Sequence, residues 1–441
     1  MPARTILFAE KGGECVRNEA KELLSTVGSE AFAQRAAACF ALFLLSFFLL
    51  STPPVRGGYR CITEFKLLLF AAAVLFFALC VLPCAILHRR LHRARAAAWA
   101  YFMLALVSAL ASPYFPKTLL GGDRMEGAAT LFLYVLAFSL LARFWCVKLS
   151  HLRVFAVCVS ALCCVSLLQL RGENPLSLFP APFDYFGANR DYAGAFVGTV
   201  GNADFTAVIL AMALTVCVGA MILHRGVQCG CFFVCGALCV CVLVMIDVAS
   251  AWVALCITAL LAPLFVLRRG RTVYLAALLA ASICAIFLLM TFPPEGGVLR
   301  ELSLLLRGDA DGSLGSGRIA IWRELLPHAA ERPLLGSGPD TVWLYDLAPF
   351  YWTRSDGTRM ASLITAAHNE YLQILCTQGV LGLLTYLTLL ALILFPRGKR
   401  SNEQMLCTMA AVCYLVWAGF GISACVSAPL FWAFLAGAVR K

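Results

Sequence analysis

Long runs of apolar residues make up most of the chain, and short clusters of charged residues separate them. A bilayer core about 30 Å thick requires roughly 20 apolar helical residues for each crossing. The pattern therefore predicts an all-α fold, a polytopic transmembrane helical bundle of about twelve spans. The expected spans are residues 34–50, 67–87, 96–111, 128–144, 154–170, 205–223, 229–246, 249–267, 272–292, 370–395, 405–420 and 424–439.

Composition agrees with this interpretation. Hydrophobic residues make up 61% of the chain and charged residues 13%, and the mean hydropathy is +0.85. A soluble domain is closer to half apolar and a quarter charged. We expect a cytoplasmic tail at 1–33, the first nine spans within 34–292, a large extracytoplasmic loop at 293–369 and the last three spans within 370–441.

The charged residues predict the orientation, because Lys and Arg are retained on the cytoplasmic side of a membrane. With the amino terminus inside, 21 of the 35 Lys and Arg residues fall on that side, compared with 6 of the 24 Asp and Glu residues. The net charge of +11 therefore reflects topology. The excess faces anionic membrane lipids, and it does not indicate a nucleic-acid partner.

The 21 cysteines invite a metal or disulfide interpretation. Five of them lie at 229–241, inside an expected span, without the paired spacing and the His or carboxylate partners that a zinc site requires. Small apolar thiols that fill helix contacts explain them better. We expect no metal site and no disulfide framework.

Two outer loops, at 171–202 and 293–367, carry most of the charge that is not cytoplasmic. The longer loop is rich in Trp and Tyr, which a disordered linker lacks. Irregular backbone at membrane depth needs water or a cavity lined by protein. We therefore expect this loop to fold over the outer mouth of the bundle, with a solvated connector as the alternative.

An amphipathic helix is predicted at 317–331, lying along the membrane surface. Its apolar arc comprises Ile319, Trp322, Leu325, Leu326 and Ala329, and its polar side Arg323, Glu324, His328 and Glu331. Arg318 breaks the pattern, since it points within about 40° of Trp322, into the apolar arc. An anion at the membrane surface, such as a phosphate, would explain an inward cation. Snorkelling of the side chain to the headgroups is the alternative.

His368 lies at the outer threshold of a predicted span. An imidazole with a pKa near 6.5 is suited to accepting a proton at neutral pH. On a helix that begins here, His368 would share a face with Tyr371 and look over the mouth of the bundle, with Glu370 roughly opposite. A histidine that caps or anchors the helix at the interface is the alternative.

The first outer loop contains Arg190 and ends in the segment GTVGN at 198–202. Asn202 has two interpretations. An Asn flanked by glycine at a helix start is a good cap, and the same segment can form an anion pocket lined by backbone.

Several motifs follow one another in a defined order along the chain. Arg318 precedes the pair Ile321–Trp322, and the segments PLLGSGP (333–339), HNEYLQ (368–373) and GVLG (379–382) follow. In order and spacing this pattern resembles the O-antigen ligase and polymerase family of bacterial membrane glycosyltransferases. Gly201–Asn202 and the segment GGDRMEG (121–127), which contains Arg124, resemble further elements of the family. The chain departs from the pattern at Ser250, where the following residue is Ala251 and members often have Arg.

The resemblance implies a fold similar to GT-C glycosyltransferases and an enzyme in the cytoplasmic (inner) membrane of a bacterium. Such an enzyme transfers a glycan from an undecaprenyl-diphosphate carrier to a hydroxyl of a glycan, lipid or wall-polymer acceptor. The reaction occurs on the outer face, inverts the anomeric centre and requires no cofactor or metal.

The resemblance also implies site residues. His368 would take the proton of the acceptor hydroxyl, and Arg318 would stabilise the departing diphosphate. Because Ala251 replaces the usual arginine, Arg190 or Arg124 would have to supply another cation. The remaining expected substrate-binding or orienting residues are Asn202, Trp322, Asn369, Glu370, Tyr371 and Gln373.

Three alternatives remain open. A polysaccharide polymerase would use the same residues with a different acceptor. A transporter or flippase would bind its cargo without chemistry, and it predicts ionisable residues near the middle of the bilayer and inverted repeats. A non-catalytic scaffold would have no use for an inward Arg318 and His368.

Overall fold

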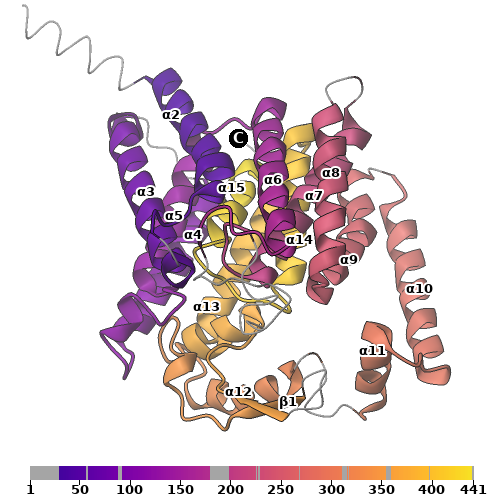
Figure 1. Cartoon of the computed structure of the whole chain (residues 1–441). Coiled ribbons are helices and arrows are strands. Elements are labelled where there is room, and N and C mark those ends of the chain that lie inside the picture. Colours follow the sequence, from indigo (N-terminus) through magenta and orange to yellow (C-terminus); the bar gives the residue numbers. More distant parts are fainter. Residues whose placement is uncertain are drawn as a thin grey trace, which may run out of the picture.

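The computed structural model describes residues 29–55, 58–87, 92–178, 198–224, 226, 229–267, 269–309, 315, 317–353, 359–396 and 398–439. Most of them belong to helices that stand side by side in a bundle (Figure 1). The helices of the first half are α2 (Glu30–Phe43), which continues into the π-helical turn η1 (Leu44–Phe48), η2 (Gly58–Cys61), α3 (Ile62–Leu87), α4 (Arg93–Leu110), η3 (Lys117–Leu119), α5 (Ala128–Phe144), α6 (Leu149–Leu170) and α7 (Ala203–Leu223).

The second half continues the bundle and adds an outer segment. Its elements are α8 (Gly230–Ile246), α9 (Ala249–Val266), α10 (Arg271–Thr291), α11 (Gly297–Arg307), α12 (Arg318–Glu331), η5 (Val342–Leu344), β1 (Phe350–Thr353), β2 (Arg359–Ser362), α13 (Glu370–Leu394), α14 (Asn402–Trp417) and α15 (Ala428–Ala438). Strands β1 and β2 pair in an antiparallel hairpin, with Phe350 opposite Ser362.

A helix occupies each of the twelve predicted spans, with ends that differ by a few residues. Among the described helices, seven are long and apolar enough to cross a membrane, namely α2 with η1, α3, α6, α7, α9, α10 and α13. Helices α5, α8 and α15 are apolar but shorter. The protein is therefore a multi-pass helical membrane protein, and a total of twelve crossings stays a prediction.

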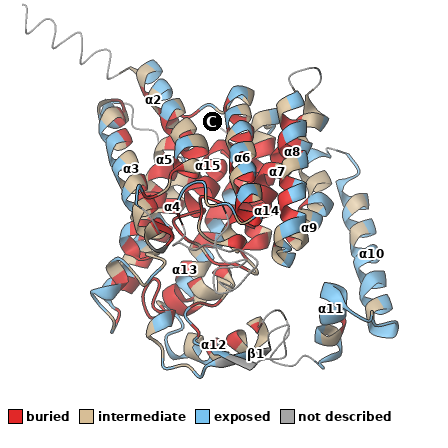
Figure 2. Ribbon diagram, in the orientation of Figure 1, coloured by how far each residue is buried: buried red, intermediate tan, exposed pale blue. Residues whose placement is uncertain are grey.

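The core lies where α7, α14 and α15 meet, because these helices are surrounded by other helices (Figure 2). Nearly every described residue of α15 is buried. Helix α10 is the opposite case, since no residue along it is buried. An apolar helix that is exposed on all sides in the isolated chain is solvated by lipid.

Helix α13 is not the unbroken span that the sequence predicted. Its backbone leaves the helical region at Gly379, where φ is 69° and ψ is −175°. The segment PLLGSGP packs into this break, and its backbone binds the freed groups. The Ser337 and Gly338 N–H groups donate to the carbonyls of Cys376 (3.2 Å) and Thr377 (2.7 Å), and Val380 N–H donates to Pro333 (2.8 Å).

This close approach explains two of the glycines. A Cβ atom on Gly336 would lie 2.4 Å from the carbonyl carbon of Thr377, and one on Gly379 would lie 2.3 Å from that of Leu334. Both glycines also have positive φ, 66° and 69°, which side chains disfavour. The PLLGSGP and GVLG motifs are therefore the two halves of one backbone junction.

Helices α11 and α12 and the hairpin lie beyond one end of the bundle (Figure 1). A second small core links α12 to the start of α13 and consists of Ile321, Leu325, Val342, Ile364, Ala367 and Cys376. Of the predicted apolar arc, Leu325 is buried and Leu326 is 54% exposed, and the face that packs on the protein is centred on Ile321 and Leu325. The sequence interpretation also missed α11 and the hairpin.

Candidate functional site

Arg318 is the first residue of α12, and its side chain turns toward the bundle. Its Nε donates to the carbonyl of Phe420 (3.0 Å), in the turn after α14, and its Nη1 donates to the carbonyl of Gly315 (2.8 Å). Burial lowers the pKa of this guanidinium, and the carboxylates of Asp204 and Glu301 oppose that shift. The cation is thus held at the mouth of the bundle by two backbone carbonyls, which use two of its five N–H groups.

His368 lies just before α13, and its backbone has a φ of 47°. The prediction that a helix begins at this residue was wrong. The side chain of Asn369 accepts a hydrogen bond from Leu372 N–H (3.0 Å) and caps the helix, so that Glu370 is its first residue. Non-glycine residues in the left-handed region are uncommon and cluster at functional sites. The direction of the imidazole is therefore set by this turn and not by the helical repeat.

The imidazole of His368 lies in a positive environment. Burial, and then the charges of Arg318 and Arg124, together lower its pKa to about 4. Among the described residues, none forms a hydrogen bond with the ring. His368 is therefore a neutral imidazole at pH 7, with its ring nitrogens available to a ligand.

The residue before His368 is held on both sides. The indole Nε1 of Trp322 donates to the Ala367 carbonyl (2.9 Å), and the Ala367 N–H donates to Oε1 of Gln373 (2.9 Å). Helix α12 and the first turn of α13 thus fix the strained backbone that carries His368. Trp322 and Gln373, which the sequence suggested as substrate-binding residues, have positioning contacts in the structure.

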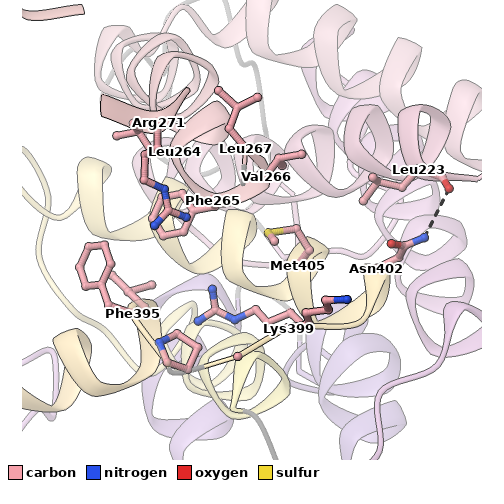
Figure 3. Close-up of a pocket in the computed structure, with 14 residues that line it drawn as sticks. Leu223, Leu264, Phe265, Val266, Leu267, Arg271, Phe395, Lys399, Asn402 and Met405 are labelled. Carbon is pink, nitrogen blue, oxygen red and sulfur yellow. Dashed lines mark hydrogen bonds between the residues drawn. The ribbon is translucent and has the colours of Figure 1, made fainter. Parts of the chain in front are cut away.

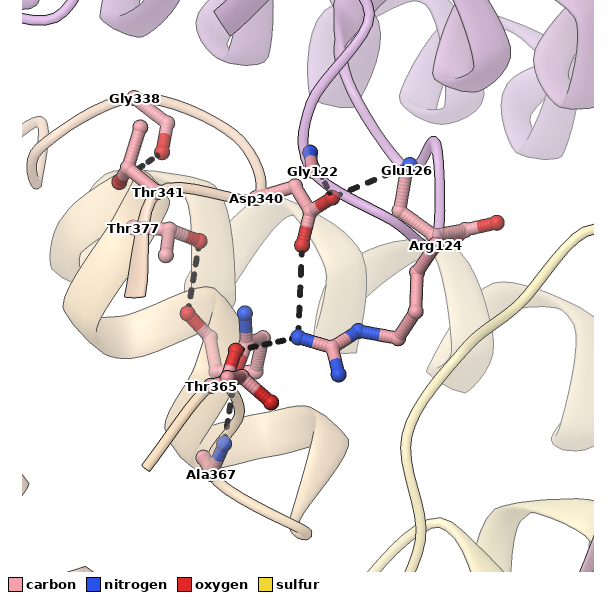
Figure 4. A network of polar contacts seen from close by, with 10 residues as sticks. Gly122, Arg124, Glu126, Gly338, Asp340, Thr341, Thr365, Ala367 and Thr377 are labelled. Carbon is pink, nitrogen blue, oxygen red and sulfur yellow. Dashed lines mark hydrogen bonds and ion pairs between the residues drawn. The ribbon is translucent and has the colours of Figure 1, made fainter. Parts of the chain in front are cut away.

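Arg124 reaches the same region from the loop between α4 and α5 (Figure 4). Its guanidinium lies 3.7 Å from the carboxylate of Asp340 and also donates to the carbonyl of Thr365. Oδ2 of Asp340 accepts hydrogen bonds from the N–H groups of Gly122 (2.8 Å) and Glu126 (3.3 Å). Burial raises the pKa of Asp340, while Arg124 and the two N–H groups lower it. Asp340 therefore fastens the part of the loop from Gly122 to Glu126.

A small pocket lies beneath these groups, with a space of about 50 Å³. Liquid water occupies about 30 Å³ per molecule, so the space holds about one or two waters and no sugar. Three acids line it, Glu126, Asp340 and Glu370. Glu370 accepts hydrogen bonds from the hydroxyls of Tyr386 (2.7 Å) and Tyr414 (3.2 Å). Burial raises the pKa of Glu126 to about 8.

Two of these residues were missed by the sequence interpretation. Glu126 stands at the start of an apolar run, and Asp340 follows PLLGSGP directly. An acid that borders an apolar run is a signal of function in a membrane protein. The hydrogen bond between the Glu126 N–H and Asp340, however, joins segments far apart in the chain, so no local pattern in the sequence predicts it.

The other predicted residues have mostly structural contacts. Asn202 caps α7, since its side chain accepts from the N–H groups of Asp204 (2.8 Å) and Phe205 (3.4 Å). The hydroxyl of Tyr371 donates to the Leu415 carbonyl (2.7 Å). Arg190 lies outside the described residues.

The departure from the family pattern also has a structural context. Ala251 is fully buried in the main core, in the first turn of α9. A buried methyl side chain supplies no charge, whereas Arg318 and Arg124 both act on His368. The described part of the site thus combines two guanidinium groups and one neutral imidazole at one end of the bundle.

Comparison with protein families agrees with this geometry. Residues 234–387 match the family model described as O-antigen ligase, a range that runs from α8 into α13 and includes Arg318 and His368. No curated protein matches the chain. The family resemblance seen in the sequence is thereby confirmed over this segment, which is an O-antigen ligase domain.

Proposed function

We propose that the protein transfers a glycan from an undecaprenyl-diphosphate-linked donor to an acceptor hydroxyl, on the outer face of a bacterial cytoplasmic membrane. The observation that carries the proposal is the environment of His368, whose imidazole lies within the electrostatic reach of two guanidinium groups from separate elements. Two cations that act on one neutral side chain favour an anion beside it. A diphosphate at the membrane boundary has the required charge.

The diphosphate would be bound by Arg318 and Arg124. Hydrogen bonds to charged groups contribute about 1.5–3 kcal/mol each, and a guanidinium offers a fork that matches phosphate oxygens. Negative charge grows on the diphosphate as the glycosidic bond breaks, so both cations would stabilise the transition state more than the ground state. Arg124 would supply the charge that the family pattern puts at position 251.

His368 would act as the general base. In the free protein its pKa is about 4, chiefly because of burial and then because of the two arginines. Binding of an anionic donor would neutralise those charges and raise the pKa toward its ordinary value near 6.5. The base would thus become stronger only when the donor is bound, and a base with a pKa near the working pH contributes roughly 10² to 10⁴-fold to the rate.

The reaction would be a direct displacement. The acceptor oxygen forms a bond to the anomeric carbon, its proton passes to His368, and the bond to the diphosphate oxygen breaks. One displacement inverts the anomeric centre, and no metal or cofactor takes part. Asn369, Glu370, Tyr371 and Gln373 would support His368 through α13.

Two alternatives to ligation remain, and one assay separates them from the proposal. Purified protein in lipid vesicles would be incubated with a polyprenyl-diphosphate-linked oligosaccharide and an acceptor. Transfer predicts release of polyprenyl diphosphate together with a glycosylated acceptor of inverted configuration. A flippase would move the donor across the bilayer and release nothing. A polymerase would extend a second lipid-linked donor, and the envelope glycans of a strain without the protein would then be shortened.

A further inference from the structure

A large pocket lies at the other end of the bundle, where α9, α10, α13 and α14 end or begin (Figure 3). Helix α7 joins the two regions, because Asp204 at its start acts on Arg318 and Leu223 at its end lines the pocket. A helix of 21 residues is about 30 Å long. The pocket is therefore about one bilayer thickness from the candidate active site.

The pocket has a space of about 580 Å³, in the range of small-molecule sites. Its apolar wall contains Leu264, Phe265 and Phe395, and the rings of the two phenylalanines stack with centroids 6.0 Å apart. These residues lie at helix ends, where the hydrocarbon of a membrane gives way to headgroups. The wall therefore suits an acyl chain or the glycerol backbone of a lipid.

Three cations line the same pocket, and no Asp or Glu is among its lining residues. Arg271, from the start of α10, and Lys399, from the link between α13 and α14, are seen in Figure 3. Arg400 comes from the same link. Like charges that gather without a counter-charge repel one another, so the arrangement favours an anion between them.

Arg400 is the second, independent sign of a ligand. One of its terminal nitrogens donates to the carbonyl of Ile393, but its Nε is buried and has no hydrogen-bond partner within the described residues. Burial lowers the pKa of this guanidinium to about 10. A buried donor without a partner costs free energy, which a phosphate oxygen would recover.

We propose that this pocket binds the phosphate of an anionic phospholipid, with the headgroup among Arg271, Lys399 and Arg400 and an acyl chain along Phe265 and Phe395. Basic pockets between membrane helices on the cytoplasmic side recognise anionic headgroups. The site is separate from the glycan-transfer site, and it ties the peripheral helix α10 to the bundle through a shared lipid. The proposal does not depend on the proposed function.

The test uses the full-length protein in a neutral detergent and follows its thermal unfolding midpoint during lipid titration. The probes are phosphatidylglycerol, phosphatidylcholine with the same acyl chains, and inorganic phosphate. We expect saturable binding of phosphatidylglycerol at least tenfold tighter than binding of phosphatidylcholine, and no stabilisation by the same concentrations of phosphate. Equal affinity for the two lipids, or equal stabilisation by phosphate alone, would overturn the phospholipid assignment.

Variants then locate the site. The double substitution Arg271→Gln and Lys399→Gln changes two exposed side chains and should weaken phosphatidylglycerol binding about 25-fold, at about fivefold per cation. Arg269→Gln is the matched control, because Arg269 is exposed in the same loop but does not line the pocket. Arg400→Lys, which keeps the charge and loses the planar fork, should bind more weakly than wild type and more tightly than Arg400→Gln. Unchanged binding in the double variant would contradict the proposal.

Discussion

The guanidinium of Arg124 lies 3.7 Å from the carboxylate of Asp340, although the two residues belong to segments far apart in the chain. Asp340 also accepts hydrogen bonds from the backbone on both sides of Arg124, at Gly122 and Glu126. The loop between α4 and α5 is therefore fastened to the segment that follows PLLGSGP. Through this contact a second cation acts on His368, on which Arg318 of α12 also acts.

Removal of the Asp340 carboxylate should loosen this loop. In Asp340→Ala the N–H groups of Gly122 and Glu126 lose their acceptor, and each group left unpaired costs about 1–3 kcal/mol. Unfolding of the reconstituted protein by a denaturing detergent should start at a lower detergent fraction. Asp346→Ala, which changes an exposed acid nearby, is the control. Equal stability of the two variants would show that Asp340 does not hold the loop.

The shape of the Arg318 side chain should matter as much as its charge. Lysine keeps the positive charge but cannot donate to Phe420 and Gly315 while it also offers a fork to phosphate. Arg318→Lys should lower glycan transfer in membranes about 10- to 100-fold, the loss of one or two charged hydrogen bonds. Arg323→Lys on the exposed face of the same helix should retain activity. Wild-type transfer by Arg318→Lys would favour simple snorkelling of the side chain.

A side chain added to a glycine at the junction between PLLGSGP and α13 should cause a steric clash in addition to backbone strain. In Gly336→Ala or Gly379→Ala the new Cβ would lie within 2.4 Å of backbone atoms, in addition to the strain of a positive φ. Gly172→Ala is the matched control, because Gly172 has a φ of 86° and a Cβ added there would meet nothing within 4 Å. We expect the control to lose about 1–2 kcal/mol and the junction variants to lose folded protein. Similar yields of all three would contradict the close packing.

The charge of Arg124 should set the acid limit of activity. Arg124 lowers the pKa of His368, so its removal raises that pKa, and the imidazole becomes protonated at higher pH. In wild type, kcat/KM should decline on the acid side with a pKa near 4. In Arg124→Gln the same decline should begin at higher pH, whatever the residual rate. Arg332→Gln, an exposed change, should leave the limit where it is. If the pH of the acid-side decline is unchanged in Arg124→Gln, Arg124 does not influence the pKa of His368.

Glu126 should set an alkaline limit. Burial raises its pKa to about 8, so the carboxyl is mostly protonated at neutral pH and ionises above that value. Ionisation adds a negative charge to the pocket that Asp340 and Glu370 already line. Transfer should therefore decline above pH 8 in wild type, while Glu126→Gln, which stays neutral, should lack this decline. The same alkaline limb in both proteins would assign it to another group.

The sequence predicted the parts of the structure that depend on local pattern. Apolar runs located the helices, and the 3.6-residue period located α12 to within one residue of its observed start. The spacing of the motifs identified the family, which the match to residues 234–387 confirms. These features follow from the burial of apolar surface and from the periodicity of the helix. Both leave a pattern that can be read in a short segment of sequence.

The remaining features depend on contacts between distant segments. The break at Gly379 is stabilised by Leu334 and its neighbours, so the apolar run of α13 concealed it. The left-handed turn at His368 is held by Trp322 and Gln373 through Ala367, and no helical wheel describes such a turn. The hydrogen bonds of Asp340 also join distant segments of the chain. The types of residue that border apolar runs suggested where functional residues lie, but only the structure shows which of them are in contact.

The central claim is that His368 and the two arginines form one site for glycan transfer. The most direct measurement is release of polyprenyl diphosphate by purified His368→Ala, compared with wild type and with His328→Ala. His328 is the matched control, since it lies on the same helix as Arg318 and pairs with Glu331 (3.0 Å). We predict that His368→Ala folds, binds the donor and releases no product above background, while His328→Ala keeps wild-type turnover. Undiminished release by folded His368→Ala would contradict the account.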